Sequence, residues 1–350
     1  MAHFPLITLS GTAAERGRQY GEAASEKIRI NIDFYTSLFQ AYGVSWEKAR
    51  VVAKSFEPCI RDYLPWAIEE MRAIAQSCGI SYEDILTINC RSEVLFAQPD
   101  GCSAFGVLPE LTENGHTLLG QTWDWLAGSR AAAVVLKVKS PTEPDAIICA
   151  EAGMIGGKGL NAHGIGVCLN ALSVGHGTIG VSLHIMYRKI LGQDTISNAL
   201  DQIAKPQRAG SGCFVLGSAS GFLMSVEFTP ENFDVLMPIS EPLCHTNHYL
   251  SPILRGADTF KRDLTDTFVR LNRLQRLCRA FNSRYTVEKV FEYLSDHANF
   301  PDSVCSHEDL ADPEGKRLCT VYAMAMDLNE KSLWITSDNP CCSDRQKISL

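Results

Sequence analysis

A cysteine directly follows an aspartate and a glycine in the stretch QPDGCSAFG (98–106). Because glycine has no Cβ, the Gly101 carbonyl can be approached closely, and the Cys102 thiol can attack it. Cleavage of the Gly101–Cys102 bond would give Cys102 an α-amine, with an ordinary pKa of about 7.7–8.0 against about 8.5 for a free thiol. That amine can take the thiol proton near neutral pH. The motif alone favours an ordinary Asp-Gly turn before a small apolar residue, and the alternative is a self-cleaving nucleophile.

The other cysteines and the histidines give weaker signs of chemistry. The chain has 13 cysteines, an odd number, and most lie in apolar runs such as IICAEAG and IGVCLNAL. This pattern predicts free thiols in a reducing compartment and no disulfide framework. Cys244, His245 and His248 stand together in CHTNHYL, but no second ligand pair has the spacing of a zinc site, so we expect no metal. Papain-like and caspase-like signatures are absent around Cys102.

Composition and charge limit the classes of partner. The chain has 350 residues, of which 45% are hydrophobic and 21% charged, as is usual for a globular protein with a sizeable core. Its net charge of −8 argues against a nucleic-acid partner. The densest basic stretch, RLNRLQRLCRAFNSR (270–284), has Leu271, Leu274 and Leu277 at helical spacing. We expect its arginines on the solvated face of an amphipathic helix.

The sequence shows no clear targeting signal. No apolar run reaches the roughly 18 residues of a membrane span. The N-terminus MAHFPLITLSG lacks the basic and apolar regions of a secretion signal, and the terminal ISL differs from a peroxisomal SKL. We therefore expect a cytoplasmic protein with no membrane or nucleic-acid partner.

The elements that must position the thiol change type near residue 100. Residues 1–97 are predicted to be mostly helical, because apolar residues recur three and four apart in 12–43 and again in the segment that Pro58 and Pro65 interrupt. Two further helices are predicted in 66–96. Beyond this part, short β-rich runs broken by Gly, Asn and Pro indicate a meandering sheet.

A glycine-rich stretch, GKGLNAHGIGVCLNAL (157–172), weakly matches a dinucleotide-binding fingerprint through Gly157, Gly159 and Ala162. That fingerprint needs a helix after it, whereas the residues that follow are strand-like. We therefore predict a hairpin here.

The rest of the chain alternates between helices and strands. A helical pair is predicted in 181–206, strands follow it, helices occupy 259–299, and CTVYAMAMDL and SLWITSD form a last hairpin. Two sheets packed face to face with helices outside would bury both inner faces. We predict an α+β fold, a four-layer αββα sandwich that forms a single domain over 1–350.

Four motifs, DGCSAFG, LLGQTWDW, EAGMIGGKGLNAHGIGVCLNAL and LCHTNHYL, occur in that order. In order and spacing they resemble the acyl-coenzyme A:6-aminopenicillanic acid acyltransferase (isopenicillin N acyltransferase) family of N-terminal-nucleophile hydrolases, from about residue 10 to residue 338. The resemblance implies the αββα sandwich of these hydrolases. It also implies autocleavage into an α fragment, 1–101, and a β fragment, 102–350, which stay together as a heterodimer with Cys102 as nucleophile.

The resemblance implies roles for residues outside the first motif. Asp124, in GQTWDW, matches the family's acid near the nucleophile and would orient the new α-ammonium group. Asn247, in HTNH, matches the donor that stabilises the oxyanion. For both residues, a place in a turn is the alternative. Arg91 and Glu93, in NCRSEV, match a substrate-binding pair, and because residues two apart on a helix do not face each other, we expect each to have its own partner.

One segment departs from the family pattern. The family commonly has Ser-Ile-Cys-Arg where this chain has SVCS, so Ser303 and Cys305 keep the pattern and Ser306 replaces the arginine. An arginine there would suit a bidentate contact with a carboxylate. We expect substrate contacts at Ser306, with His307 or Arg317 as candidates to take the place of the arginine.

The resemblance implies an enzyme that moves an acyl group from an amide or an acyl-coenzyme A, through a Cys102 thioester, to an amine or water, in penicillin-type secondary metabolism. Acyl-coenzyme A would be a donor substrate, and no cofactor is expected. Two alternatives remain open. One is a hydrolase of linear amides with a different N-acyl substrate, and the other is an uncleaved, catalytically silent binding protein.

Overall fold

Strands β2 and β3 are buried along nearly their whole length, because the sheet they belong to is covered on both faces. The computed structural model describes residues 3–95, 101–238 and 240–350. The sheet has six strands in the order β11-β2-β3-β12-β13-β14. Its strands are β2 (Gly101–Val107), β3 (Leu118–Leu126), β11 (Leu243–His245), β12 (Leu318–Asp327), β13 (Ser332–Thr336) and β14 (Arg345–Ser349).

The second sheet has eight strands in the order β1-β4-β5-β6-β7-β8-β9-β10, and it packs against the first mainly through β7. β1 pairs in parallel with β4, and the other neighbouring strands of this sheet are antiparallel. Its strands are β1 (Leu6–Ser10), β4 (Ala133–Lys139), β5 (Ala146–Glu151), β6 (Lys158–Asn161), β7 (Ile165–Ala171), β8 (Gly212–Ser218), β9 (Phe222–Phe228) and β10 (Phe233–Leu236).

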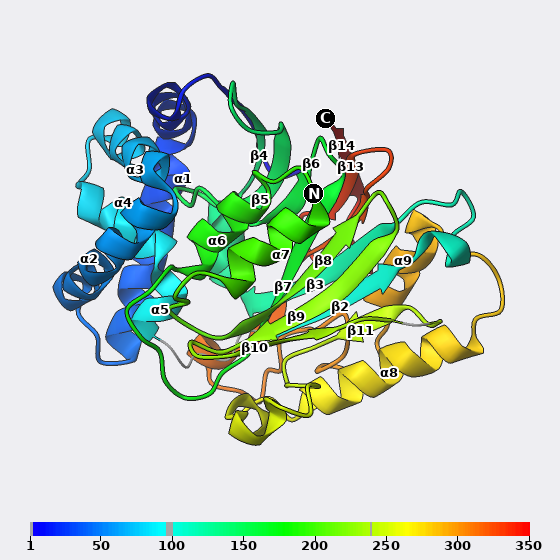
Figure 1. The fold of residues 1–350 in the computed structure, drawn as a ribbon. Helices are drawn as coiled ribbons and strands as arrows, with labels where there is room; N and C mark the ends of the chain where they lie inside the picture. Colours follow the sequence, from blue (N-terminus) through cyan, green and yellow to red (C-terminus); the bar gives the residue numbers. More distant parts are fainter. Residues whose placement is uncertain (1–2, 96–100, 239) are drawn as a thin grey trace.

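Helices cover the outer faces of both sheets (Figure 1). α6 (Leu183–Ile190) and α7 (Ile196–Ala204) lie on the eight-stranded sheet, whereas α8 (Asp266–Ala280) and α9 (Val287–Leu294) lie on the six-stranded sheet. Gly120 lets α9 pack closely against β3, because a Cβ at this position would collide with the Val290 side chain of α9. The four layers are the αββα sandwich that the sequence predicts.

The N-terminal helices stand beside one end of the sandwich (Figure 1). Gly17 and Gly21 let α1 approach α3 closely, because a Cβ at either glycine would meet backbone oxygens of α3. The prediction that Pro58 interrupts a helix is wrong: Pro58 lies inside α2, where buried Phe56 and Ile60 keep the helix packed despite the missing N–H. These helices are α1 (Ala13–Ala41), α2 (Trp46–Tyr63), α3 (Pro65–Cys78), α4 (Tyr82–Asn89) and α5 (Arg91–Leu95).

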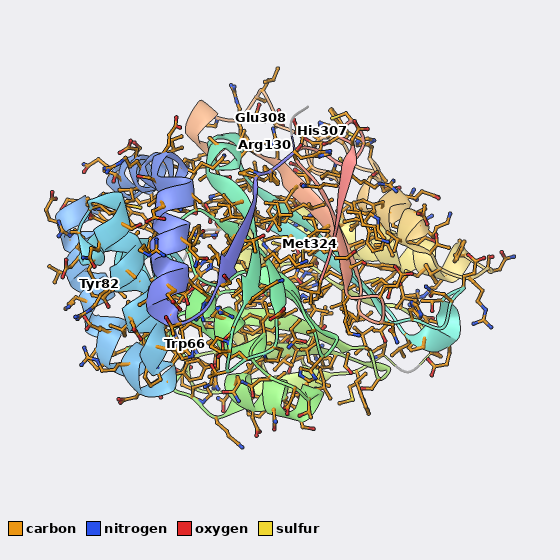
Figure 2. The ribbon with its side chains drawn as sticks, turned by 90° about the horizontal axis from the view of Figure 1, so that it is seen from above. Trp66, Tyr82, Arg130, His307, Glu308 and Met324 are labelled. Atoms are coloured by element: carbon orange, nitrogen blue, oxygen red, sulfur yellow. The ribbon has the colours of Figure 1, made fainter. Side chains whose placement is uncertain are left out.

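The view from above shows Trp66 and Tyr82 among these helices and Met324, in β12, near the middle of the molecule (Figure 2). Among the described residues, no helix combines the length and the apolar character needed to cross a membrane.

The glycine-rich stretch forms the predicted hairpin, with β6 antiparallel to β7. Gly164 makes the turn between them with a φ of 74°. Gly157 and Gly159 serve strand packing, because a Cβ at these positions would meet the carbonyl oxygens of Cys149 and Ile147 in β5.

Candidate active site

The pairing of β2 with β3 places the Gly101–Cys102 peptide between two cavities. In the antiparallel register Gly101 lies opposite Asp124, and Cys102 lies opposite Trp123. Because side chains alternate along a strand, Cys102 and Trp123 share one face and Asp124 lies on the other. Cys102 and Trp123 line one cavity, called here the thiol cavity. Gly101 and Asp124 line the second, called here the acid cavity.

The requirement for glycine at position 101 comes from a close approach and not from a left-handed turn. Gly101 begins β2 and has no positive φ. A Cβ built on it would lie 2.9 Å from the Asp124 Cβ and 3.3 Å from Asp124 Oδ2. Glycine therefore leaves the space that the Asp124 side chain occupies next to the peptide. Asp100 lies outside the described residues.

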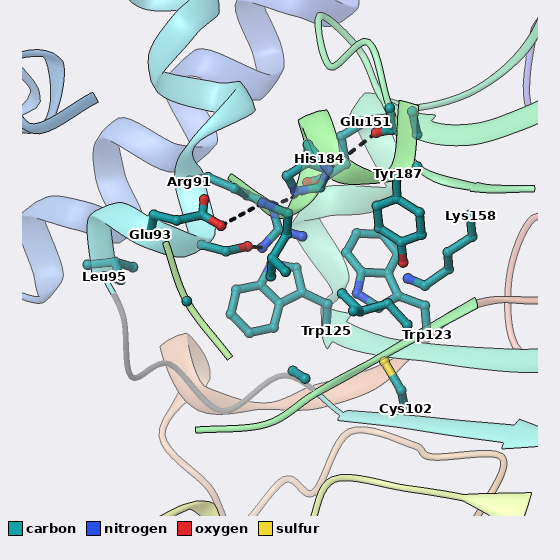
Figure 3. A pocket seen from close by; sticks show the side chains of 18 of the residues that line it. Arg91, Glu93, Leu95, Cys102, Trp123, Trp125, Glu151, Lys158, His184 and Tyr187 are labelled. Carbon is teal, nitrogen blue, oxygen red and sulfur yellow. Dashed lines mark hydrogen bonds and ion pairs between the residues drawn. The ribbon is translucent and has the colours of Figure 1, made fainter. Parts of the chain in front are cut away.

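The backbone of Cys102 is held on both sides. Its N–H donates to Asn247 Oδ1 at 2.8 Å. Its carbonyl oxygen accepts from Arg270 Nη1 at 2.8 Å and from Asn170 Nδ2 at 3.1 Å. The residue is almost fully buried, and in Figure 3 its sulfur points toward the thiol cavity. These hydrogen bonds fix the backbone of Cys102 in β2.

Arg270 is a site residue that the sequence interpretation placed wrongly on a solvated face. It is only 2% exposed, because α8 turns it toward β2. Its guanidinium also donates to Asn247 Oδ1 at 3.1 Å and forms an ion pair with Asp266 at 2.6 Å. Burial lowers its pKa, but the carboxylates of Asp266 and Asp124 outweigh this and raise it, so the group stays charged. The burial of Arg270 could have been predicted from helical spacing, because this residue lies four positions before the buried Leu274 and therefore on the same face of the helix.

Asp124 is buried and has hydroxyl partners on both carboxylate oxygens. Thr320 Oγ1 donates to Oδ1 at 2.6 Å, and Thr122 Oγ1 donates to Oδ2 at 3.4 Å. These two hydrogen bonds hold the Asp124 carboxylate beside the Gly101–Cys102 peptide.

Asn247 contacts the cysteine with its amide oxygen, while its Nδ2 donates to the Ala171 carbonyl at 3.1 Å. The segment around it is anchored by a buried pair, His245 Nε2 and Glu227 Oε1, 2.8 Å apart. Burial lowers the pKa of His245, but the nearby Cys213 and Glu227 raise it to about 10. The pair therefore anchors the segment two residues before Asn247.

Arg91 and Glu93 both line the thiol cavity, and each has its own partner as predicted (Figure 3). Arg91 Nε lies 3.0 Å from Glu151 Oε2, whereas Glu93 Oε1 accepts from the Leu183 N–H at 2.7 Å. Burial raises the pKa of Glu93 to about 7, against the lowering effect of the Leu183 N–H. Burial also lowers the pKa of His184, which lines the same cavity, to about 3, so this imidazole is neutral.

Lys158 is a second residue that sequence reasoning missed, although it stands within a quoted motif. It is 8% exposed and lines the thiol cavity. Its Nζ lies 4.8 Å from the Trp123 ring centroid and 5.6 Å from that of Tyr322. In the described part of the chain, no carboxylate forms an ion pair with it. The cavity thus combines a thiol, aromatic walls and a lysine ammonium.

Ser306, for which the sequence suggests a substrate contact, lines the acid cavity with Asp124. Its N–H donates to the Thr320 hydroxyl at 2.9 Å, and this hydroxyl donates to Asp124. His307 lines neither cavity, and the Arg317 guanidinium binds backbone carbonyls of its own loop. Two other arginines line the acid cavity, Arg262 and, from α8, Arg270.

The sequence matches a known family and a known protein. A family described as acyl-coenzyme A:6-aminopenicillanic acid acyl-transferase matches residues 111–341, a range that includes Asp124 and Asn247 and begins after Cys102. The acyl-coenzyme A:6-aminopenicillanic-acid-acyltransferase 40 kDa form of Emericella nidulans is 27% identical over 329 residues, which are 92% of this chain and 89% of that protein.

A solved structure shows the same architecture. The crystal structure of a mutant conjugated bile acid hydrolase from Clostridium perfringens matches with a TM-score of 0.50 at 10% identity, over 71% of this chain and 97% of that chain. The fold is that of the N-terminal-nucleophile hydrolases.

Proposed function

Because the chain belongs to the acyl-coenzyme A:6-aminopenicillanic acid acyltransferase family, we propose that it is a self-processing enzyme that transfers acyl groups through a thioester on Cys102. The observation that carries the proposal is the position of the Gly101–Cys102 peptide. The thiol faces one cavity, while Asp124 approaches the same peptide from the other. The N–H and the carbonyl of Cys102 are bonded to Asn247 and Arg270, so this peptide is held in a fixed position between the two cavities.

In the proposed maturation, Cys102 Sγ attacks the Gly101 carbonyl carbon. The peptide C–N bond breaks, and the Cys102 nitrogen takes the proton that the thiol loses. Water then hydrolyses the thioester, which leaves a carboxyl group on Gly101 and restores the thiol. The new α-amine has an ordinary pKa of about 7.7–8.0, suited to proton transfer at neutral pH.

In the proposed turnover, the α-amine of Cys102 accepts the thiol proton, and the thiolate attacks the acyl carbonyl of the substrate. The C–N bond of an amide, or the C–S bond of an acyl-coenzyme A, breaks, and the leaving group takes the proton from the α-ammonium. An amine or water then attacks the thioester and returns a proton to the sulfur through the α-amine. Asn247 Nδ2 is the proposed donor to the oxyanion of each tetrahedral intermediate, in place of its bond to Ala171.

The thiol cavity supports a substrate with an apolar acyl chain and an acidic group. Trp123, Trp125 and Tyr322 give it aromatic walls, and its volume of about 90 Å³ suits a slender chain. The Lys158 ammonium lies over two of these rings and can pair with a carboxylate. A penicillin-type compound is an acid that carries an N-acyl group, and a cavity of about 90 Å³ would admit its acyl chain but not the whole molecule.

The test is a substrate panel with purified, processed protein. Penicillins, acyl-coenzyme A thioesters and N-acyl amino acids are incubated with and without 6-aminopenicillanic acid, and the products are identified by mass spectrometry. We expect an acylated amine when the acceptor is present and the free acid when it is absent. Free acid as the sole product under both conditions would identify an amide hydrolase.

The matched controls are Cys102→Ala and Cys342→Ala, since Cys342 is an exposed thiol that lines neither cavity. The first variant should stay a single chain and form no product, whereas the second should behave as the unmodified protein. An intact 350-residue chain with full activity would refute the proposed maturation.

A further inference from the structure

Two histidines and two cysteines meet at the edge of the molecule, outside both cavities. One ligand atom from each of His297, Cys305, His307 and Cys341 can be chosen so that all four atoms lie within 4.8 Å of one another. His307 Nε2 lies 3.1 Å from His297 Nε2 and 3.6 Å from each of the two sulfur atoms. His307 lies at the edge of the molecule in the view of Figure 2.

These separations match the edges of a tetrahedral zinc site. For Zn–N bonds of about 2.0–2.1 Å and Zn–S bonds of about 2.3 Å, neighbouring ligand atoms in a tetrahedron lie about 3.4 Å apart for two nitrogens and about 3.6 Å apart for nitrogen and sulfur. The observed distances of 3.1 and 3.6 Å agree with these values to within a few tenths of an ångström. The four ligand atoms are therefore already close enough to surround a single ion.

We propose that His297, Cys305, His307 and Cys341 bind a Zn²⁺ ion. The ligand set is that of a closed Cys₂His₂ site, in which four protein ligands leave no position for substrate. The ion would therefore be structural. It would also give His307, for which the sequence interpretation suggested a substrate contact, a different role.

The surroundings suit such a site. Asn339 Nδ2 donates to Cys305 Sγ at 3.5 Å and to the Ser306 carbonyl at 2.6 Å, and outer-shell hydrogen bonds of this kind orient metal ligands. Arg130 Nη2 holds the Asn339 side chain from behind, at 3.2 Å. His297 and Cys341 are exposed, so an ion has a path to the site.

The position of the site indicates which two segments the ion would link. Three ligands lie within 297–307, and the fourth lies in the C-terminal segment after β13. Ser306, between two of the ligands, is bonded to Thr320, whose hydroxyl binds Asp124. Zinc would thus fasten the loop that carries Ser306 to the C-terminal segment and keep this wall of the acid cavity in place.

The metal content of the full-length protein tests the proposal without reference to activity. Protein kept under a thiol-free reductant is stripped with a chelator, titrated with Zn²⁺ against a chromophoric chelator, and analysed by elemental mass spectrometry. We expect about one zinc per chain. Co²⁺ should give the thiolate charge-transfer and intense d–d bands of a tetrahedral site with sulfur ligands.

Matched variants locate the site. Cys341→Ser and His297→Ala change exposed side chains and should fold, and each should lower zinc affinity at least tenfold, while Cys342→Ser, one residue away, should bind as the unmodified protein does. Equal zinc affinity in Cys341→Ser and Cys342→Ser would overturn the proposal. So would a failure of the reduced protein to bind zinc, or a Cys305–Cys341 disulfide in protein purified without an oxidant.

Discussion

Replacing Gly101 with alanine tests whether the contact between this residue and Asp124 sets the rate of self-cleavage. The added Cβ would lie 2.9 Å from the Asp124 Cβ. Carbon atoms in contact prefer at least about 3.5 Å, so β2 and the Asp124 side chain must separate by about 0.6 Å. A misplacement of about 1 Å can cost about 100-fold in rate, which makes a displacement of about 0.6 Å worth roughly 10- to 20-fold. We expect Gly101→Ala to cleave that much more slowly.

The assay follows the intact chain and the two fragments on denaturing gels after a pulse of expression, and it yields a first-order rate. Gly256→Ala is the control, because a Cβ at Gly256 meets nothing within 4 Å and its φ is not left-handed. Crowding of this kind destabilises a protein by about 1–3 kcal/mol, so thermal unfolding of Gly101→Ala must show a folded protein before the rates are compared. Cleavage of folded Gly101→Ala at the rate of the control would refute the reasoning.

Four further outcomes follow from the site. Asn247→Asp keeps an acceptor for the Cys102 N–H but loses the Nδ2 donor, so we expect processing to continue while kcat falls about 10²–10³-fold; unchanged kcat with a raised KM would make Asn247 a ground-state contact. Limiting iodoacetamide should label Cys102 first and abolish turnover in proportion, as peptide mass spectrometry can show, whereas label mainly on other thiols would contradict its role as the most reactive one. Lys158→Met should raise KM for substrates that carry a carboxylate and leave KM for neutral ones unchanged; an equal effect on both would exclude an ionic contact. Burial raises the pKa of Glu93 from 4.5 to about 7, so this residue contributes stability below pH 4.5 that is lost as the pH rises through about 7. Relative to Glu93→Gln, the free energy of unfolding should fall by about 3 kcal/mol between these pH values in denaturant titrations. Parallel pH profiles of the two proteins would refute this.

Local patterns were enough to predict most of the architecture. The apolar period of α1 and the strand-like residues on both sides of Gly164 lie within single elements, so the sequence predicts the long helix and the β6–β7 hairpin. Two edge strands, β1 and β14, were missed. Each has only five residues. β1 is fixed by β4, which lies far away in the chain, whereas β14 pairs with the nearby β13 but has Ile348 as its single apolar residue and so shows no strand pattern.

The site was predictable where a motif carries the chemistry and less so where tertiary contacts do. Cys102, Asp124 and Asn247 lie in quoted motifs, and the structure brings them together. Arg270 reaches the Cys102 carbonyl only because α8 packs over β2, and nothing in the motifs gives that packing. The meeting of His307 with Cys341 likewise depends on the folding of the C-terminal segment against a distant loop.

Strand β1 has a consequence for the proposed maturation. It lies in the N-terminal fragment but pairs along its whole length with β4, which lies in the C-terminal fragment. Once the chain is cut, this ladder becomes an intersubunit one, and loss of the N-terminal fragment would leave β4 as a bare edge prone to pair with other chains. Before the cut, the covalent link supplies β1 to β4 at a local concentration that two separate chains would not reach. The covalent link in the uncut chain would thus promote the pairing of β1 with β4. If the two fragments were made separately, their association would compete with aggregation of the exposed β4 edge.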